Sequence, residues 1–184
     1  MIFVALIHFP VLNRKGEVIN SAVTNLDMHD IARAARTYGV HGYYVATPLE
    51  DQQKLAADLA GHWLKGIGGE KNPDRKNALG IIRIVNDIEE VIQDIEAQTG
   101  RSPEIYATSA VKRGNCITWQ AMRERVQSDG EQPFLILFGT ASGLADEALA
   151  MADGVICPIS GPSPYNHLSV RSAASITLDR LAGI

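Results

Sequence analysis

Apolar strand-like runs alternate with stretches of helical periodicity along this chain, and that alternation constrains its fold more than any other feature. The runs at residues 2–7 (IFVALI) and 133–138 (PFLILF) are apolar throughout or nearly so, as in strands buried on both faces of a parallel sheet. Between them, residues 27–38 carry apolar side chains at helical spacing and are followed by Gly39, a residue typical of helix C-termini. The pattern predicts an α/β fold with a mostly parallel sheet and helices on both faces.

The rest of the chain continues this pattern. A cluster of glycines followed by Asn72-Pro73-Asp74 predicts a long loop from Gly66 to Lys76, able to close over a substrate. No repeat or linker interrupts the sequence, so one domain spanning residues 1–184 is expected. Further strands are predicted at 43–46, 81–85, 104–107 and 154–157, and further helices at 51–64, 88–98, 119–127, 144–151 and 169–181.

The two cysteines and the N-terminus indicate the cellular compartment of the protein. Cys116 and Cys157 lie 41 positions apart without a CxxC spacing, which supports neither a zinc site nor a disulfide framework. We therefore expect two small buried thiols in a reducing cytoplasm. The apolar N-terminus has no basic segment or cleavage site, and no apolar run approaches the ~20 residues of a membrane span. A soluble cytoplasmic protein without a membrane partner is expected.

Several common catalytic motifs are absent. The first run is followed by HFPVLNRKG instead of GxGxxG, and no GxxxxGK[ST] occurs. The turn at 139–143 (GTASG) has its serine one place too late for a hydrolase elbow. No group of His, Cys, Asp or Glu has metal-ligand spacing. Dinucleotide enzymes, P-loop ATPases and hydrolases are thus disfavoured, and no metal is expected.

Two unusual turns follow consecutive predicted strands near the C-terminus. One is the glycine-bearing turn at 139–143; the other, at 158–164 (PISGPSP), leads through YNHLS into the last predicted helix. Ligands of open α/β sheets bind beyond the carboxyl ends of the strands, so these turns indicate a site. The alternative is ordinary turn chemistry, in which glycine and proline only fix the backbone.

Four blocks of the sequence resemble a known family: AVTNLDMHDIARAARTYGV (22–40), NPDRKNAL (72–79), LFGTASGL (137–144) and YNHLSVRSAASITLDRL (165–181). Together they resemble the SPOUT class of RNA methyltransferases that use S-adenosyl-L-methionine (SAM), especially short single-domain bacterial members related to tRNA guanine-N1 methyltransferases. The resemblance implies a C-terminal deep trefoil knot, a homodimer with its active site at the subunit interface, and SAM held by backbone groups and apolar contacts.

The resemblance also assigns site residues. Arg33 lies six residues before Gly39, as an arginine of the family's first motif does, and Asn25 is the matching asparagine; Arg36 is the competing arginine. Such an arginine fixes an RNA phosphate or helps to remove a proton, although a solvated helix-face arginine is the alternative. The implied cofactor contacts are Leu137, Phe138, Gly139, Ile156, Pro158, Ile159, Gly161, Leu168 and Ser169.

Two departures from the family's ribose-methylating branch bear on the acceptor atom. Thr140 and Ala141 stand where that branch usually has a glutamate, and Tyr165-Asn166-His167 stand where it reads Ser-Leu-Asn. A ribose 2′-hydroxyl is a poor nucleophile that needs help, so these departures favour a base nitrogen without excluding the ribose. His167 is a candidate acid/base group or phosphate contact, with capping or packing as the alternative.

The net charge of -4 argues against an RNA partner only as an average. Residues 61–86 carry five Lys or Arg against two acids and residues 97–128 also five against two, while 87–96 and 129–153 each carry five acids and no Lys or Arg. These basic segments predict contacts to tRNA or rRNA, although solvated faces are the alternative. The candidate RNA-binding residues are Lys71, Arg75, Lys76, Lys112 and Arg113.

The function predicted is methyl transfer from SAM to an RNA nucleotide, by direct in-line attack and without a metal. The Ser- and Ala-rich helix predicted at 169–181 is the expected dimer seam, with close packing inside one subunit as the alternative. The competing functions are a non-catalytic knotted RNA-binding or regulatory protein and, less favoured because phosphate-binding loops are absent, an unrelated α/β enzyme for a small nucleotide.

Overall fold

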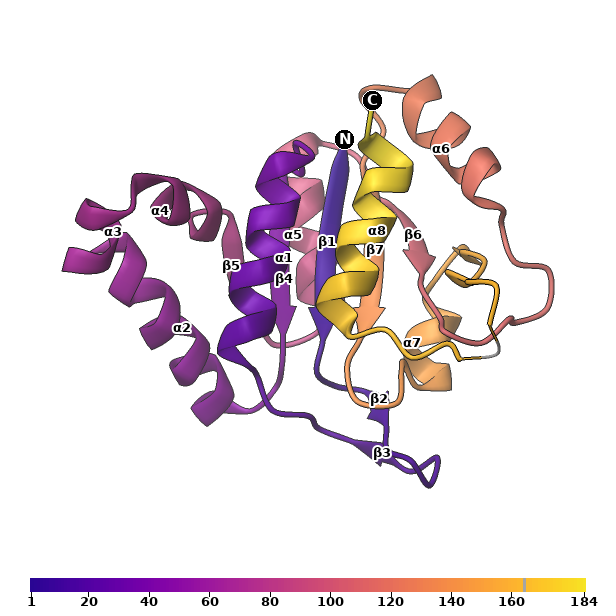
Figure 1. Ribbon diagram of the computed structural model, residues 1–184, viewed down its shortest axis with the longest axis horizontal. Helices are drawn as coiled ribbons and strands as arrows, with labels where there is room; N and C mark the ends of the chain where they lie inside the picture. The colour runs from indigo at the N-terminus through magenta and orange to yellow at the C-terminus, as the bar shows by residue number, and fades with distance from the viewer. Residues whose placement is uncertain (164) are drawn as a thin grey trace.

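A six-stranded sheet, parallel throughout, forms the centre of the computed structural model, which describes residues 1–163 and 165–184 (Figure 1). Pro164, the last residue of a predicted turn, lies outside the described residues. The strand order is β5-β4-β1-β7-β6-β8, so the two longest apolar runs pair in the middle. The strands are β1 (Ile2–Ile7), β4 (Gly42–Ala46), β5 (Ile82–Val85), β6 (Glu104–Ala107), β7 (Phe134–Gly139) and β8 (Gly154–Val155).

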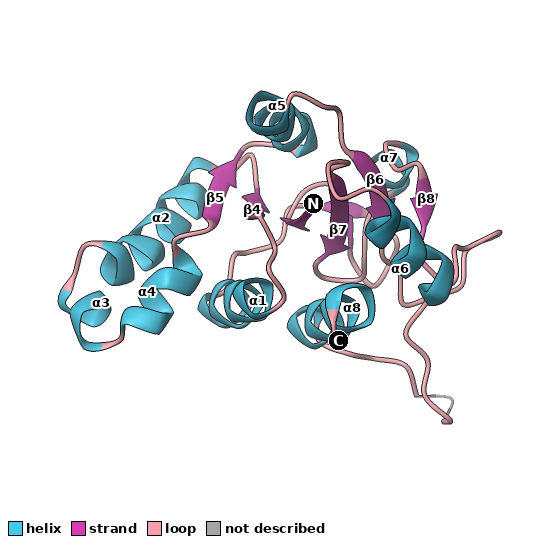
Figure 2. Ribbon diagram, turned by 90° about the horizontal axis from the view of Figure 1, so that it is seen from above, coloured by secondary structure: helices cyan, strands magenta, loops and turns pink. Residues whose placement is uncertain are grey.

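Helices cover both faces of this sheet, as the alternation predicts (Figure 2). On one face α1 (Asn25–Thr37) and α8 (Val170–Ala182) pack side by side with α6 (Trp119–Ser128) next to them. On the other face lie α5 (Ile88–Thr99) and α7 (Asp146–Ala150). Alternate residues of β1 enter the two hydrophobic cores: Val4 belongs to the α1 side and Phe3 to the α5 side. The α/β prediction is confirmed.

The predicted loop from Gly66 to Lys76 is wrong, because two short helices occupy it. After α2 (Glu50–Leu64), α3 (Ile67–Lys71) and α4 (Pro73–Leu79) form a helical arm beyond the β5 edge of the sheet (Figure 1). Asn72 begins α4: its side chain accepts a hydrogen bond from the Arg75 N–H, and Pro73 fills the first helical position. The Asn-Pro pair is therefore a helix start and not the continuation of a loop.

A small hairpin after β1 was not expected from the sequence. Its strands, β2 (Val11–Leu12) and β3 (Val18–Ile19), flank a turn in which the Asn13 side chain accepts the N–H groups of Lys15 and Glu17. The hairpin also holds the turn after β7, since the backbone of Leu12 exchanges hydrogen bonds with Gly143 and Ser142. The predicted polar loop is therefore a structural support for the candidate site.

The expectation of two buried thiols is wrong, because Cys116 and Cys157 form a disulfide and are each only half-buried. The cause is a parallel β-bridge between Ile117 and Ile156, which brings the two cysteine Cα atoms to 4.9 Å. This pairing depends on the tertiary fold and not on sequence spacing. None of the helices that the structure describes is long and apolar enough to cross a membrane.

Candidate functional site

Three loops converge where strands β6, β7 and β8 end: the β6–α6 loop (108–118), the β7–α7 loop (140–145) and the β8–α8 loop (156–169). The backbone N–H and the hydroxyl of Thr108 both donate to the Leu137 carbonyl, at 3.0 and 2.9 Å. The Ile156 N–H donates to the Ala107 carbonyl at 2.9 Å. Carboxyl ends of parallel strands are where α/β sheets bind ligands, so this cluster of loops is the candidate cofactor site.

The β6–α6 and β8–α8 loops are fastened to each other at several points along their length. The Cys116–Cys157 disulfide joins them covalently, and the Ile117 N–H donates to the Val155 carbonyl at 2.8 Å. Further out, the Asn166 side-chain amide donates to the Ala110 carbonyl at 2.8 Å. The two loops therefore form one connected wall beside the strand ends.

The β7–α7 loop folds back sharply, and Gly139 permits this. A Cβ at position 139 would lie 2.6 Å from the Leu144 nitrogen and 2.8 Å from the Gly143 carbonyl carbon, closer than any side chain tolerates. Thr140 is buried and its hydroxyl donates to the Ile7 carbonyl at 2.9 Å. Thr140, one of the two residues that stand where the ribose branch has a glutamate, therefore anchors this loop to β1.

The predicted cofactor contacts differ in what they can offer a ligand. Leu137 and Phe138 are buried, and the Leu137 carbonyl already accepts two hydrogen bonds from Thr108. Ser169 is the N-cap of α8, where its hydroxyl accepts the Ser172 N–H. The side chains of Leu137 and Phe138 are therefore not accessible to a cofactor, and the Ser169 hydroxyl already has a partner.

The β8–α8 loop provides the donor set that suits a nucleoside. Among the described residues, the backbone N–H groups of Ile159, Ser160 and Gly161 have no hydrogen-bond partner. Leu168, on the same loop, exposes its side chain. Backbone donors of this kind match the polar edge of an adenine ring, and an exposed apolar side chain matches its faces. These residues fit the implied SAM.

Arg33 lies in a groove of about 500 Å³ between α1 and α8. Arg36 is exposed one turn further along α1, and Asn25 is exposed at the first position of α1. Neither is among the described residues that line this groove. The structure thus separates the two competing arginines by position. The lining residues are Asp30, Arg33, Ala34, Thr37, Arg171, Ser172, Ser175 and Ile176.

A charged cluster that the sequence did not reveal joins α1 to α8 at this groove. The Arg171 guanidinium lies 3.2 Å from a carboxylate oxygen of Asp27 and 3.4 Å from one of Asp30. Asp27 is buried and also accepts a hydrogen bond from the Thr24 hydroxyl at 2.7 Å. Asp27 and Asp30 lie three residues apart on one helix face, which indicates from the sequence that they can share a cationic partner. That partner, Arg171, is 144 positions away from Asp27, so the sequence did not identify it.

His8 is a second group that sequence reasoning missed. It follows β1 directly and is fully buried, and its Nδ1 hydrogen-bonds the Ser21 hydroxyl at 2.9 Å, which in turn hydrogen-bonds Thr140. Burial lowers the pKa of His8 to about 4, against the opposing effects of the Asp27 charge and the bond to Ser21. A neutral imidazole therefore ties the end of β1 to the β7–α7 loop at neutral pH.

The predicted RNA-binding residues fall into two separate groups. Lys71, Arg75 and Lys76 belong to the helical arm beyond β5, whereas Lys112 and Arg113 belong to the β6–α6 loop near β8. Since β5 and β8 are the two edges of the sheet, one subunit does not bring the groups together.

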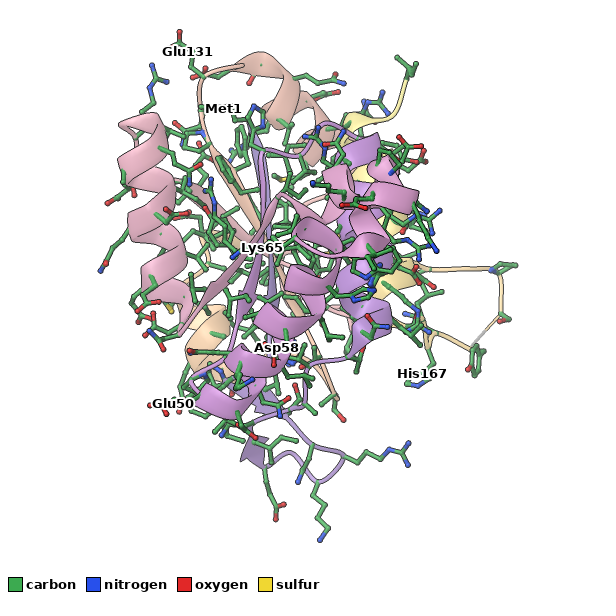
Figure 3. The ribbon with its side chains drawn as sticks, turned by 90° about the vertical axis from the view of Figure 1, so that its left-hand side faces the viewer. Met1, Glu50, Asp58, Lys65, Glu131 and His167 are labelled. Carbon is green, nitrogen blue, oxygen red and sulfur yellow. A yellow bond between two sulfur atoms is a disulfide. The ribbon has the colours of Figure 1, made fainter. Side chains whose placement is uncertain are left out.

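His167 stands apart from the groove-lining residues. Figure 3 shows it on the β8–α8 loop, away from the sheet, and its side chain is exposed. The imidazole ring lies 6.4 Å from the Tyr165 ring, at an interplanar angle of 83°. His167 is thus accessible to a substrate without being part of the groove that contains Arg33.

Comparisons with known proteins identify relatives of the whole chain. Two proteins named tRNA (guanine-N(1)-)-methyltransferase, from Oleidesulfovibrio alaskensis and Nitratidesulfovibrio vulgaris, are 45% and 44% identical over 182 residues. These matches cover 99% of this chain, but this chain spans only 42% of each relative. An uncharacterized protein of Aquifex aeolicus is 36% identical over 180 residues, which cover 98% of this chain and 87% of that protein.

Solved structures match at the level of the fold. A probable methylase family protein from Haemophilus influenzae has a TM-score of 0.63 at 18% identity, over 98% of this chain and 64% of the other. The SpoU methyltransferase AviRb from Streptomyces viridochromogenes, solved in complex with AdoMet, has a TM-score of 0.60 at 18% identity, over 99% and 59%. The model of a family described as SAM-dependent RNA methyltransferase matches residues 1–183. This chain therefore belongs to the family of SAM-dependent RNA methyltransferases.

Proposed function

We propose that this chain transfers the methyl group of SAM to a base nitrogen of tRNA, with N1 of guanine as the acceptor. The observation that carries the proposal is the convergence of three loops at the ends of β6, β7 and β8, two of which are joined to each other by a disulfide and a hydrogen bond, in a chain of this family. The acceptor is suggested by the names of the two relatives. Those names describe proteins more than twice as long as this chain, so the acceptor needs a direct test.

The cofactor site of the proposal lies on the β8–α8 loop and the end of β7. SAM supplies a methyl carbon that its sulfonium already makes electrophilic, so the protein's main task is to hold donor and acceptor about 3 Å apart and exclude water. The N–H groups of Ile159 and Gly161, which have no partner among the described residues, and the side chain of Leu168 are suited to bind it. Gly139, Ile156 and Pro158 would shape the floor and wall of the site.

The acceptor side of the proposal uses Arg33, Asn25 and His167. Arg33 would hold an RNA phosphate in the groove between α1 and α8, because a guanidinium binds phosphate in a bidentate manner. Guanine N1 carries a proton that must leave when the methyl group arrives, and exposed His167 is suited to accept it. Asn25, exposed at the start of α1, would hydrogen-bond the RNA.

The proposal includes a knot and a dimer. We infer that the β8–α8 loop is threaded through the β6–α6 loop as a trefoil knot, as in the resembling family; the disulfide and the Asn166–Ala110 bond between these loops support it. We also infer that a second copy packs on the α8 side of the α1–α8 groove, whose small serines allow close approach, so that a phosphate held by Arg33 lies at the edge of the subunit interface. A tRNA substrate would place the protein in the cytoplasm.

Two measurements test the proposed function. Calorimetry with SAM should show binding, and transfer of a labelled methyl group to tRNA transcripts should yield N1-methylguanosine in the digested nucleosides. Failure to bind either SAM or S-adenosylhomocysteine would reject the methyltransferase activity. A ribose-methylated nucleoside would instead move the acceptor to the 2′-hydroxyl, and RNA binding without transfer would favour the non-catalytic alternative.

A further inference from the structure

The strongest unexplained feature of the surface is an exposed aromatic side chain beside the candidate cofactor site. Tyr165 is 74% exposed, and it alone is exposed among the Trp, Tyr and Phe residues, all of which lie in the described part of the chain. Val111, on the neighbouring loop, is 69% exposed. Large apolar side chains displayed this way commonly mark a binding surface.

These two exposed residues are held close together by the loops that carry them. Asn166 follows Tyr165 in the chain, and its amide donates to the carbonyl of Ala110, which precedes Val111. The Cys116–Cys157 disulfide fixes the same two loops at their base. Because the two loops are already held together, a ligand that binds there loses little free energy to ordering them.

Positive charge lies next to this aromatic surface. Lys112 and Arg113 directly follow Val111, and both are exposed. Arg113 pairs with Asp146 at 3.4 Å, but the aspartate side chain is almost fully exposed, so this pair is weak and a phosphate competes with it readily. An aromatic ring flanked by cations suits a ligand that has both a flat base and a phosphate.

We propose that the exposed face formed by Val111, Lys112, Arg113, Tyr165 and His167, here named the two-loop platform, binds an unpaired nucleotide of the RNA substrate. The Tyr165 ring stacks on the base, and Lys112 and Arg113 contact the adjacent phosphates. The inference rests on the proposed function, because it assumes that the substrate is RNA. It gives Tyr165 a direct role in substrate binding. In the sequence, Tyr165 stands out only because it differs from the Ser-Leu-Asn motif of the ribose-methylating branch.

The exposed Tyr165 ring favours an unpaired base over a duplex. The ring packs edge to face with the His167 ring and is still largely exposed, so it offers a flat surface to a single base. A base inside a duplex is stacked on its neighbours and cannot stack on the ring, whereas the bases of a tRNA loop can be splayed out. Leu168 and the N–H groups that have no partner among the described residues belong to the same loop, so the loop that carries Tyr165 also carries the candidate cofactor contacts.

Fluorescence anisotropy with two RNA probes tests the platform. One probe is a short hairpin with an unpaired loop, and the other is a blunt duplex with the same number of phosphates. The Tyr165→Ala variant should bind the hairpin about tenfold more weakly and the duplex within about twofold of wild type, whereas Tyr165→Phe keeps the ring and should bind both normally. Lys112→Ala should weaken binding of both RNAs.

Matched controls and a stacking readout separate this role from a structural one. Leu55→Ala removes another exposed apolar side chain and Lys54→Ala removes one positive charge, both on α2; both variants should bind like wild type. A 2-aminopurine in the hairpin loop should lose fluorescence on binding to wild type and Tyr165→Phe but not to Tyr165→Ala. Circular dichroism melts should be unchanged, because Tyr165 is exposed.

The outcomes distinguish the platform from the proposed function. If Tyr165→Ala binds and methylates the hairpin like wild type, or if wild type binds neither probe, the platform is overturned. If Tyr165 is needed for hairpin binding but wild type transfers no methyl group to any tRNA, the platform stands and the methyltransferase proposal falls.

Discussion

The buried His8 should make the stability of this protein depend on pH. Its pKa is about 4 in the folded state and near 6.5 when unfolded, so the unfolded chain binds more protons in that interval. The stabilisation is thus present above pH 6.5 and is lost as the pH falls towards 4, by about 3 kcal/mol at most. Denaturant unfolding from pH 7 to 4.5 should show a steeper loss for wild type than for His8→Asn. Equal slopes, or a His8 resonance titrating near pH 6.5, would contradict this.

Arg33 and Arg36 provide a matched pair of substitutions on one helix. Of these two arginines, Arg33 alone is among the described residues that line the α1–α8 groove, so Arg33→Ala should abolish methyl transfer to tRNA and leave SAM affinity within a few-fold of wild type. Arg36→Ala removes the same charge outside the groove and should keep most of the activity. Single-turnover transfer assays measure the methyl-transfer rate of each variant, and calorimetry measures its affinity for SAM. Full activity in Arg33→Ala would overturn the assignment.

At the residue scale, the sequence predicted the features that depend only on neighbouring residues in the chain. Gly39 has a φ of 70°, the left-handed conformation expected after a helix. The Cys116–Cys157 bond and the Asp27–Arg171 pair were not predictable, because each joins residues brought together only by the tertiary fold. The same holds for the hydrogen bonds that connect His8, through Ser21, to the β7–α7 loop.

Among the loops, the tight turn after β7 depends on Gly139. The Gly139→Ala variant would place a methyl group against the backbone of Leu144, so the loop must move or the protein loses about 1–3 kcal/mol of stability. We expect a lower Tm and weaker SAM binding. Gly130→Ala is the control, because a Cβ there meets nothing within 4 Å and its φ is not positive. Equal melting temperatures for the two variants would show that the turn adapts.

The disulfide between the β6–α6 and β8–α8 loops should contribute to stability and to loop order. It closes a chain segment of 41 residues, for which loss of unfolded-state entropy predicts a stabilisation of about 2–4 kcal/mol. The double variant Cys116→Ser with Cys157→Ser should melt at a lower temperature and bind SAM more weakly. Dithiothreitol should lower the Tm of wild type towards that of the variant and leave the variant unchanged. A wild type insensitive to the reductant would contradict the prediction.

The strands and helices themselves followed closely from periodicity, with two informative exceptions. The long runs became β1 and β7 within one residue of their predicted ends. The strands β2 and β3 have two residues each, too few to show any alternation. α3 and α4 were hidden because glycines indicate a loop, whereas Gly69 is needed where α3 packs against the Trp63 carbonyl.

On the scale of the whole molecule, strand order decides which charges can act together. Periodicity predicts strands but not their order, and it is the order that separates Arg75 from Arg113 at opposite edges of the sheet. A single subunit therefore cannot apply both basic groups to one nucleotide. If both groups bind RNA in the proposed dimer, they contact different parts of one RNA or act from different subunits.

The proposed dimer is tested by placing one large charged side chain in the α1–α8 groove. Ser175 lines the groove, and its hydroxyl donates to the Arg171 carbonyl; Ser128, exposed on α6, donates to the Arg125 carbonyl in the same way. Ser175→Arg should therefore block a packed partner, whereas Ser128→Arg introduces the same side chain elsewhere.

Sedimentation velocity should report a dimer for wild type and Ser128→Arg and a monomer for Ser175→Arg. If the active site is shared between subunits, methyl transfer should disappear in the monomer while its Tm stays near that of the control. A dimeric Ser175→Arg would exclude the groove as the interface. A fully active monomer would show instead that one subunit holds the complete site, and that Arg33 reaches its substrate without a partner.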